Sequence, residues 1–159
     1  MSEEFKIETH YLYPGALYVS DSPCNITTVL GSCVAVCLYD PFLKIGGINH
    51  LMLPLWNGQG LASPKYGNIA IEKLIEKMIS LGASKIRMQA KVFGGGEVIG
   101  PEGGHFKIGE RNIEVAIGML NEYKIPIVGK SVGGRLGRKI VFNTQTGAVM
   151  HKFLERTDE

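Results

Sequence analysis

Short apolar runs of strand length fill most of the chain and are separated by turn residues. Residues 26–30 and 34–39 are rich in β-branched and apolar side chains, a composition that favours β-strands. Both runs are nearly continuous, so we expect each of these strands to be buried on both faces. The same pattern predicts further strands over residues 16–19, 45–52, 86–92, 127–130, 139–143 and 148–153.

Two longer segments instead carry the period of an amphipathic helix. Ser63 and Pro64 suit a helix start, with serine as the N-cap and proline at the first helical position. Apolar side chains then recur every three or four positions until Gly82, a typical helix stop. A second helix is predicted from Gly109 until shortly before Pro126. Its apolar stripe comprises Ile113, Ala116, Ile117 and Leu120.

The order of these elements is strands, helix, strand, helix, strands. Because strands and helices do not alternate regularly, we expect an α+β fold with mixed β-sheets packed together and flanking helices. A length of 159 residues and a hydrophobic content of 45% favour one globular domain over residues 1–159. Residues 1–10 and 155–159 are polar and are expected to fray.

Charge and composition restrict the function classes. The formal net charge is only +2, without a basic cluster, so no nucleic-acid partner is expected. The apolar runs are too short to cross a bilayer, and the acidic start does not resemble a signal peptide, so we expect a cytoplasmic protein without membrane insertion. The three cysteines are expected to be free thiols, and no Cys/His pattern predicts a metal site.

The candidate chemistry centres on Cys33, which follows Gly31 and Ser32 in a turn between two predicted strands. His50 ends the next apolar run, so a thiol and an imidazole, the two groups of a cysteine hydrolase, lie near each other. A Gly-Ser-Cys turn exposes the sulfur and directs backbone N–H groups at an oxyanion. Thr27 is the candidate to orient His50, and pairing with histidine would favour the thiolate.

The same residues have ordinary alternatives. Most cysteines are small buried hydrophobes, most strand histidines are packed and hydrogen-bonded, and threonine is a common strand residue. His105 is a rival to His50. Gly94, Gly95 and Gly96 lack the spacing of a nucleotide-binding motif, so they predict turns or a close backbone approach to the site.

Two loops are candidates for the rim of a binding groove. Residues 53–63 form a long predicted loop that contains Trp56, the only tryptophan, either as an anchor for a partner or as a staple for the loop. Residues 94–105 form the second, glycine-rich loop. The sequence assigns no role to Arg138.

Taken together, these motifs resemble the CheD family of chemoreceptor glutamine deamidases. The resemblance rests on Thr27, residues 30–36, residues 47–54, residues 91–95 and residues 108–112, and it extends from about residue 11 to about residue 153. It implies a Cys-His-Thr triad of Cys33, His50 and Thr27. It also implies a fold similar to the catalytic domain of deamidating toxins.

The family also implies a substrate and partners. The expected reaction converts receptor glutamines to glutamate and releases ammonia, without metal or organic cofactor. The expected partner is the helical cytoplasmic region of methyl-accepting chemotaxis receptors. An alternative is a regulatory binding partner of a CheC-type phosphatase, and a general cysteine peptidase is a third possibility.

Overall fold

The computed structural model describes residues 7–56, 58–97 and 107–155, which fold into two β-sheets and two α-helices. One sheet has the strand order β1-β3-β8-β9, and the other has the order β2-β5-β4-β6-β7. The strands are β1 Glu8–Tyr11, β2 Leu17–Ser20, β3 Cys24–Leu30, β4 Val34–Asp40, β5 Ile45–Asn49, β6 Gln89–Gly94, β7 Ile127–Val132, β8 Arg138–Asn143 and β9 Val149–Phe153. The helices are α1 Gly67–Ser80, α2 Ile108–Glu122 and the short 3-10 helix η1 Lys85–Arg87.

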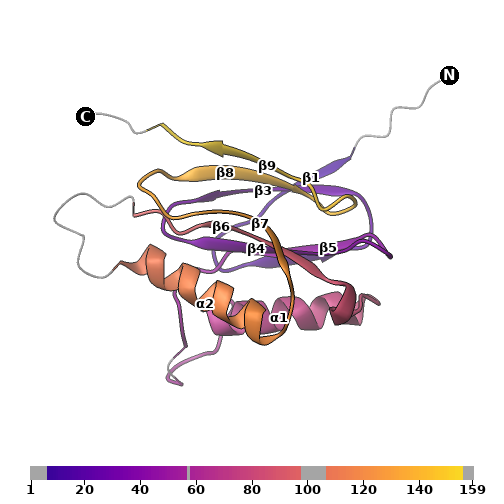
Figure 1. Cartoon of the computed structure of the whole chain (residues 1–159), viewed down its shortest axis with the longest axis horizontal. Coiled ribbons are helices and arrows are strands. Elements are labelled where there is room, and N and C mark those ends of the chain that lie inside the picture. The colour runs from indigo at the N-terminus through magenta and orange to yellow at the C-terminus, as the bar shows by residue number, and fades with distance from the viewer. Residues whose placement is uncertain (1–6, 57, 98–106, 156–159) are drawn as a thin grey trace.

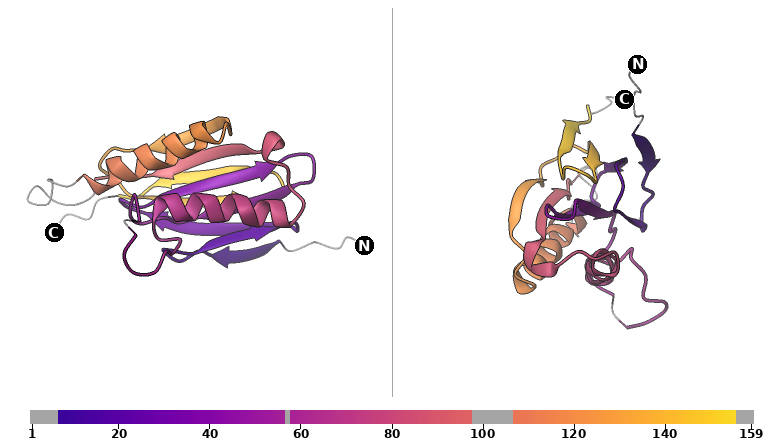
Figure 2. Two further views of the ribbon diagram at one scale, coloured as in Figure 1. Left: turned by 90° about the horizontal axis from the view of Figure 1, so that it is seen from below. Right: turned by 90° about the vertical axis from the view of Figure 1, so that its right-hand side faces the viewer.

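The elements are stacked in three layers (Figures 1 and 2). The two sheets pack face to face, and α1 and α2 lie side by side on the outer face of the five-stranded sheet. Both sheets are mixed, because β1–β3 and β6–β7 pair in parallel while the other neighbours are antiparallel. The predicted α+β class with mixed sheets and flanking helices is therefore confirmed. No described helix is long and apolar enough to cross a membrane.

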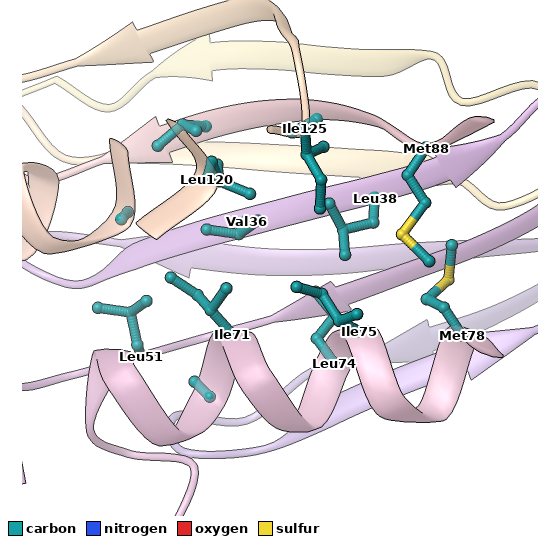
Figure 3. Packing of buried hydrophobic residues seen from close by; sticks show 14 of the residues in the cluster. Val36, Leu38, Leu51, Ile71, Leu74, Ile75, Met78, Met88, Leu120 and Ile125 are labelled. Atoms are coloured by element: carbon teal, nitrogen blue, oxygen red, sulfur yellow. The ribbon is translucent and has the colours of Figure 1, made fainter. Parts of the chain in front are cut away.

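Apolar side chains from the helices and the five-stranded sheet form the first core cluster (Figure 3). Ile71 and Leu74 of α1 and Leu120 of α2 are fully buried with Val36 and Leu38 of β4. Burial of each such side chain contributes about 1.5–3 kcal/mol. The helices are thus fixed to the face of β4 that points away from the other sheet.

A second core cluster lies between the two sheets. Ile26 and Leu30 of β3 and Phe142 of β8 are buried with Ala35 of β4 and Ile48 of β5. Since β4 has a cluster on each face, its predicted burial on both faces is confirmed. The same prediction is wrong for β3, whose alternate side chains are turned away from the core.

Several predicted boundaries need correction. Residues 64–65 form a turn, and pairing with Leu53 holds Tyr66 in an extended conformation, so α1 begins at Gly67 and not at Pro64. Residues 85–87 form η1, and the following strand starts at Gln89. Residues 8–10, expected to fray, belong to β1 and pair with β3. Most of the two predicted tails, residues 1–6 and 156–159, lies outside the described residues.

Asp40 ties the end of β4 to the connection between α1 and β6. Its buried carboxylate pairs with Arg87 at 2.8 Å and accepts hydrogen bonds from the backbone N–H of Ser84 and Phe42. Burial alone would raise the pKa of this carboxyl, but these hydrogen bonds outweigh it and lower the pKa. The ionised Asp40 therefore stabilises the folded state fully at a pH above the ordinary pKa of aspartate. This stabilisation is lost as the pH falls through the lowered pKa that Asp40 has in the folded state.

We expect Asp40→Asn to lower the free energy of unfolding by about 3 kcal/mol, because it leaves the hydrogen bonds of Arg87 and the turn without a charged acceptor. Urea unfolding at pH 7 measures the change. Asp21→Asn is the matched control, since Asp21 is exposed. Equal stability of the two variants would contradict the structural role of Asp40.

Candidate active site

The register of β4 and β5 places Cys33 and His50 on the same face of the five-stranded sheet. Cys37 lies opposite Ile48, and Val34 bridges Leu51 through two backbone hydrogen bonds of 3.1 and 2.9 Å. This register puts Ala35 opposite His50, so Cys33 is the diagonal neighbour of His50. Diagonal neighbours have backbones about 7–8 Å apart, within reach of long or aromatic side chains.

Thr28 fixes the imidazole of His50 through a hydrogen bond. The Nδ1 atom of His50 lies 2.7 Å from Oγ1 of Thr28, and His50 is only 2% exposed. The Thr28 hydroxyl donates its single hydrogen to the carbonyl oxygen of Leu12 at 2.7 Å, so its oxygen accepts from Nδ1–H. This hydrogen-bond network assigns the proton to Nδ1 and leaves a lone pair on Nε2, to which no described residue donates a hydrogen bond.

Thr27, the residue predicted to orient His50, does not do so. Successive side chains of a strand point to opposite faces, and the core face of β3 carries Ile26, Thr28 and Leu30. Thr27 is turned to the outer face, where it lies between Tyr11 and Val141. Thr28 therefore replaces Thr27 beside the imidazole. The alternation of Ile26 and Leu30 is the sequence signal that distinguishes the two threonines.

Burial keeps the thiol and the imidazole in their neutral forms. It raises the pKa of Cys33 above its ordinary value of 9.0, and it lowers the pKa of His50 to about 4. At neutral pH the resting pair is thus thiol and imidazole, and the expected thiolate is not favoured. A neutral imidazole can accept a proton from a thiol as the sulfur attacks a carbonyl carbon.

The neutral pair predicts a specific pH dependence for alkylation by iodoacetamide. Cys33 reacts first at pH 7, because it is half-buried whereas Cys24 and Cys37 are buried. Its rate keeps rising beyond pH 9, since the thiolate forms only above the raised pKa. Peptide mass mapping over pH 5–10, with free cysteine as the reference, measures this. A rate at Cys33 that levels off below pH 8 would instead indicate a preformed ion pair.

The turn from Gly31 to Cys33 is held by its carbonyl groups. The carbonyl oxygen of Gly31 accepts from the N–H of Gly96 at 2.9 Å, and that of Cys33 accepts from the N–H of Gly95 at 2.8 Å. The carbonyl oxygen of Ser32 accepts from Asn112 at 2.9 Å. No described residue accepts a hydrogen bond from the N–H groups of Gly31, Ser32 or Cys33. These donors are therefore free to bind an oxyanion.

The glycines after β6 allow this close approach. A methyl group on Gly94 would overlap the carbonyl oxygen of Cys33, and Gly94 has a φ of +110°. A methyl group on Gly96 would lie 2.7 Å from the carbonyl oxygen of Leu136. The prediction that this glycine run approaches the site is confirmed for residues 94–96.

We expect Gly94→Ala to lower the free energy of unfolding by about 3 kcal/mol, because it adds both a steric overlap and a strained φ. The variant should also lose alkylation selectivity for Cys33, since the turn must move. Thermal unfolding and mass mapping measure the two effects. Gly118→Ala is the control, because Gly118 lies in α2 with open space around it. A Gly94→Ala protein as stable as the wild type would contradict this packing.

Of the remaining candidate residues, the structure describes Trp56 and Arg138. Trp56 donates from its backbone N–H to Asn68 and from its indole to the carbonyl oxygen of Gln59, so it fastens its own loop. Arg138 is buried and donates to backbone carbonyl oxygens at the end of β7 and in the following turn. His105 lies outside the described residues. Among the described residues no group of His, Cys, Asp or Glu could hold a metal ion.

Asn112 lies at the site but is not among the residues predicted from the sequence. The predicted apolar stripe of the second helix starts at Ile113, whereas the fully buried positions of α2 are Gly109, Asn112, Ala116 and Leu120. Asn112 is thus one turn ahead of Ala116 on the buried side. A polar residue in line with the buried positions of a helix is the sequence signal that could have identified Asn112.

The family described as "CheD chemotactic sensory transduction" matches residues 52–153. A protein of Trichlorobacter lovleyi named "Probable chemoreceptor glutamine deamidase CheD" is 54% identical over 91% of this chain and 89% of its own length. A protein of Sulfurimonas denitrificans with the same name is 48% identical over 95% of this chain and 97% of its own length. The chain belongs to the CheD family.

Proposed function

We propose that this protein hydrolyses the side-chain amide of glutamines in chemoreceptors to glutamate and ammonia. The observation that carries the proposal is the arrangement of Cys33, His50 and Thr28 around a turn whose N–H groups donate to no described residue. The names of the relatives, chemoreceptor glutamine deamidases, point to the same substrate. The likeness to deamidating toxins and the action on methyl-accepting receptors remain predictions of the family resemblance.

The first half of the reaction forms a thioester. The sulfur of Cys33 attacks the amide carbon of glutamine while Nε2 of His50 takes the thiol proton. The electron pair of the carbonyl moves to oxygen, and the N–H groups of the turn, Gly31 and Ser32 among them, bind the resulting oxyanion. His50 returns the proton to the amide nitrogen, the carbon–nitrogen bond breaks, and ammonia leaves.

The second half regenerates the thiol. A water molecule attacks the thioester carbon while His50 accepts its proton, and a second oxyanion occupies the same N–H groups. The carbon–sulfur bond then breaks, and the sulfur of Cys33 takes the proton from His50. Glutamate is left on the receptor. Thr28 keeps the ring of His50 in one orientation through both steps.

The first predicted rim loop, residues 53–63, is suited to contact a protein substrate. It begins directly after the bridge between Val34 and Leu51, next to the turn that holds Cys33. Its apolar residues Leu55 and Leu61 are 60% and 88% exposed. Exposed apolar side chains on this loop are available for contact with another protein. The second predicted rim, residues 94–105, is described only up to Glu97.

Incubation with a receptor cytoplasmic fragment tests the function. We expect peptide mass mapping to find an increase of about one dalton at specific glutamines, together with released ammonia. Cleavage of the fragment would instead identify a peptidase. An unchanged fragment and no ammonia would contradict the proposal.

Association with a CheC-type phosphatase remains a further prediction of the resemblance. Mixing the two proteins and measuring the mass of the complex in solution tests it. The absence of a complex at micromolar concentrations would contradict this partnership and leave the deamidase proposal intact.

A further inference from the structure

Asn112 joins the two chain segments that carry the catalytic pair. Its side chain is fully buried near the start of α2. The Nδ2 atom donates to the carbonyl oxygen of Ser32 at 2.9 Å and to that of Met52 at 3.1 Å. Ser32 precedes Cys33, and Met52 lies two residues after His50. One amide group therefore fixes the nucleophile's turn relative to the strand of the base.

The bond to Ser32 also sets the direction of a potential oxyanion donor. A peptide unit is planar and trans, so its C=O and its N–H point in opposite directions. The carbonyl group of Ser32 and the N–H group of Cys33 belong to the same peptide unit. By anchoring that carbonyl oxygen, Asn112 directs the N–H of Cys33 the other way. No described residue accepts a hydrogen bond from this N–H.

The neighbouring peptide unit is oriented in the same manner. The N–H of Gly96 holds the carbonyl oxygen of Gly31 and thereby directs the N–H of Ser32. Asn112 differs from Gly96 because it supplies the bond from a side chain, which a substitution can remove. Its own Oδ1 is buried and accepts no hydrogen bond from any described residue, an arrangement that costs free energy. The fold therefore depends on the NH2 group of Asn112, which donates to both carbonyl oxygens.

We propose that Asn112 is a positioning residue of the oxyanion site, which aims the N–H of Cys33 at the developing negative charge by anchoring the carbonyl group of Ser32. The inference rests on the proposed function in taking Cys33 as the nucleophile. Replacing Asn112 should therefore slow the attack of the Cys33 sulfur on a carbonyl carbon. Reactions of the same sulfur that form no oxyanion remain unaffected.

Two small electrophiles separate these reactions. Acylation of Cys33 by p-nitrophenyl acetate passes through an oxyanion, whereas alkylation by iodoacetamide is a direct displacement without one. For Asn112→Ala we expect acylation to slow by about 10- to 100-fold, because a misdirected donor loses most of its stabilisation. Alkylation of Cys33 should change by less than about threefold. With a receptor fragment, kcat should fall in proportion to acylation while KM stays unchanged.

Asn112→Asp is a second variant that keeps the volume of the side chain and removes its donors, for use if Asn112→Ala does not fold. Asn121→Ala is the matched control, since Asn121 is exposed on the same helix. Thermal unfolding verifies the fold of each variant.

An equal loss of acylation and alkylation in a folded variant would overturn the inference, as would no loss of either. These outcomes leave the proposed function untouched. Conversely, a wild-type protein that acylates Cys33 normally but deamidates no receptor would contradict the proposed function while the role of Asn112 stands.

Discussion

Replacing Cys33 by alanine is expected to lower receptor deamidation by at least about 10⁴-fold, because the sulfur forms the bond that replaces the amide. Cys24→Ala and Cys37→Ala test the same chemistry at the other two thiols. Cys37 is fully buried, and burial raises its pKa strongly, so its sulfur does not ionise in the working range of pH. Both control variants should keep deamidation within about threefold of the wild type once their stability has been matched.

The measurement is the rate of glutamate formation at single receptor glutamines, followed by peptide mass mapping. Circular dichroism establishes that each variant is folded. Near-normal deamidation by Cys33→Ala would contradict the assignment of the nucleophile. Loss of activity in a folded, stable Cys37→Ala protein would indicate that Cys37, and not Cys33, supplies the reacting sulfur.

Replacing Thr28 by valine is expected to lower kcat by about 10²-fold with little change in KM. Valine keeps the branched shape but removes the oxygen that accepts from Nδ1–H of His50, so the ring loses its fixed tautomer and orientation. Thr27→Val is the matched control on the same strand. Its side chain lies on the outer face between Tyr11 and Val141, so its activity should match that of the wild type.

Steady-state kinetics of the two valine variants with one receptor fragment measures the difference. A loss in Thr27→Val with normal activity in Thr28→Val would restore the role predicted from the sequence. It would also contradict the hydrogen bond between Thr28 and His50. Wild-type activity in both variants would show that neither hydroxyl orients the ring of His50 during catalysis.

The two threonines show how far the sequence predicts the site. The turn, the cysteine and the histidine follow from residue types and spacing, and the structure places Cys33 and His50 on one face. The orienting residue depends on which way a single side chain points. In β3 that direction is fixed by packing of Ile26 and Leu30 against the other sheet. A continuous apolar run does not reveal this, and the same run led to the wrong prediction of burial on both faces.

The fold class was predictable because the strands and helices have strong patterns and short connections. The start of α1 was not, since it depends on a distant segment. The N–H groups of Met52 and Leu53 both donate to the carbonyl oxygen of Lys65, and Tyr66 is extended where it pairs with Leu53. This pairing overrides the local preference of Ser63 and Pro64 for a helix start. Contacts between segments of this kind are not encoded in any local window.

In the proposed reaction, the sulfur of Cys33 carries out the deamidation. The most direct test treats the protein with increasing amounts of iodoacetamide and compares the remaining receptor deamidation with the modified fraction of each cysteine. We expect activity to fall in direct proportion to modification of Cys33 and to reach zero when that residue is fully modified, whatever the state of Cys24 and Cys37. Full deamidation activity in a protein whose Cys33 is completely carbamidomethylated would contradict it.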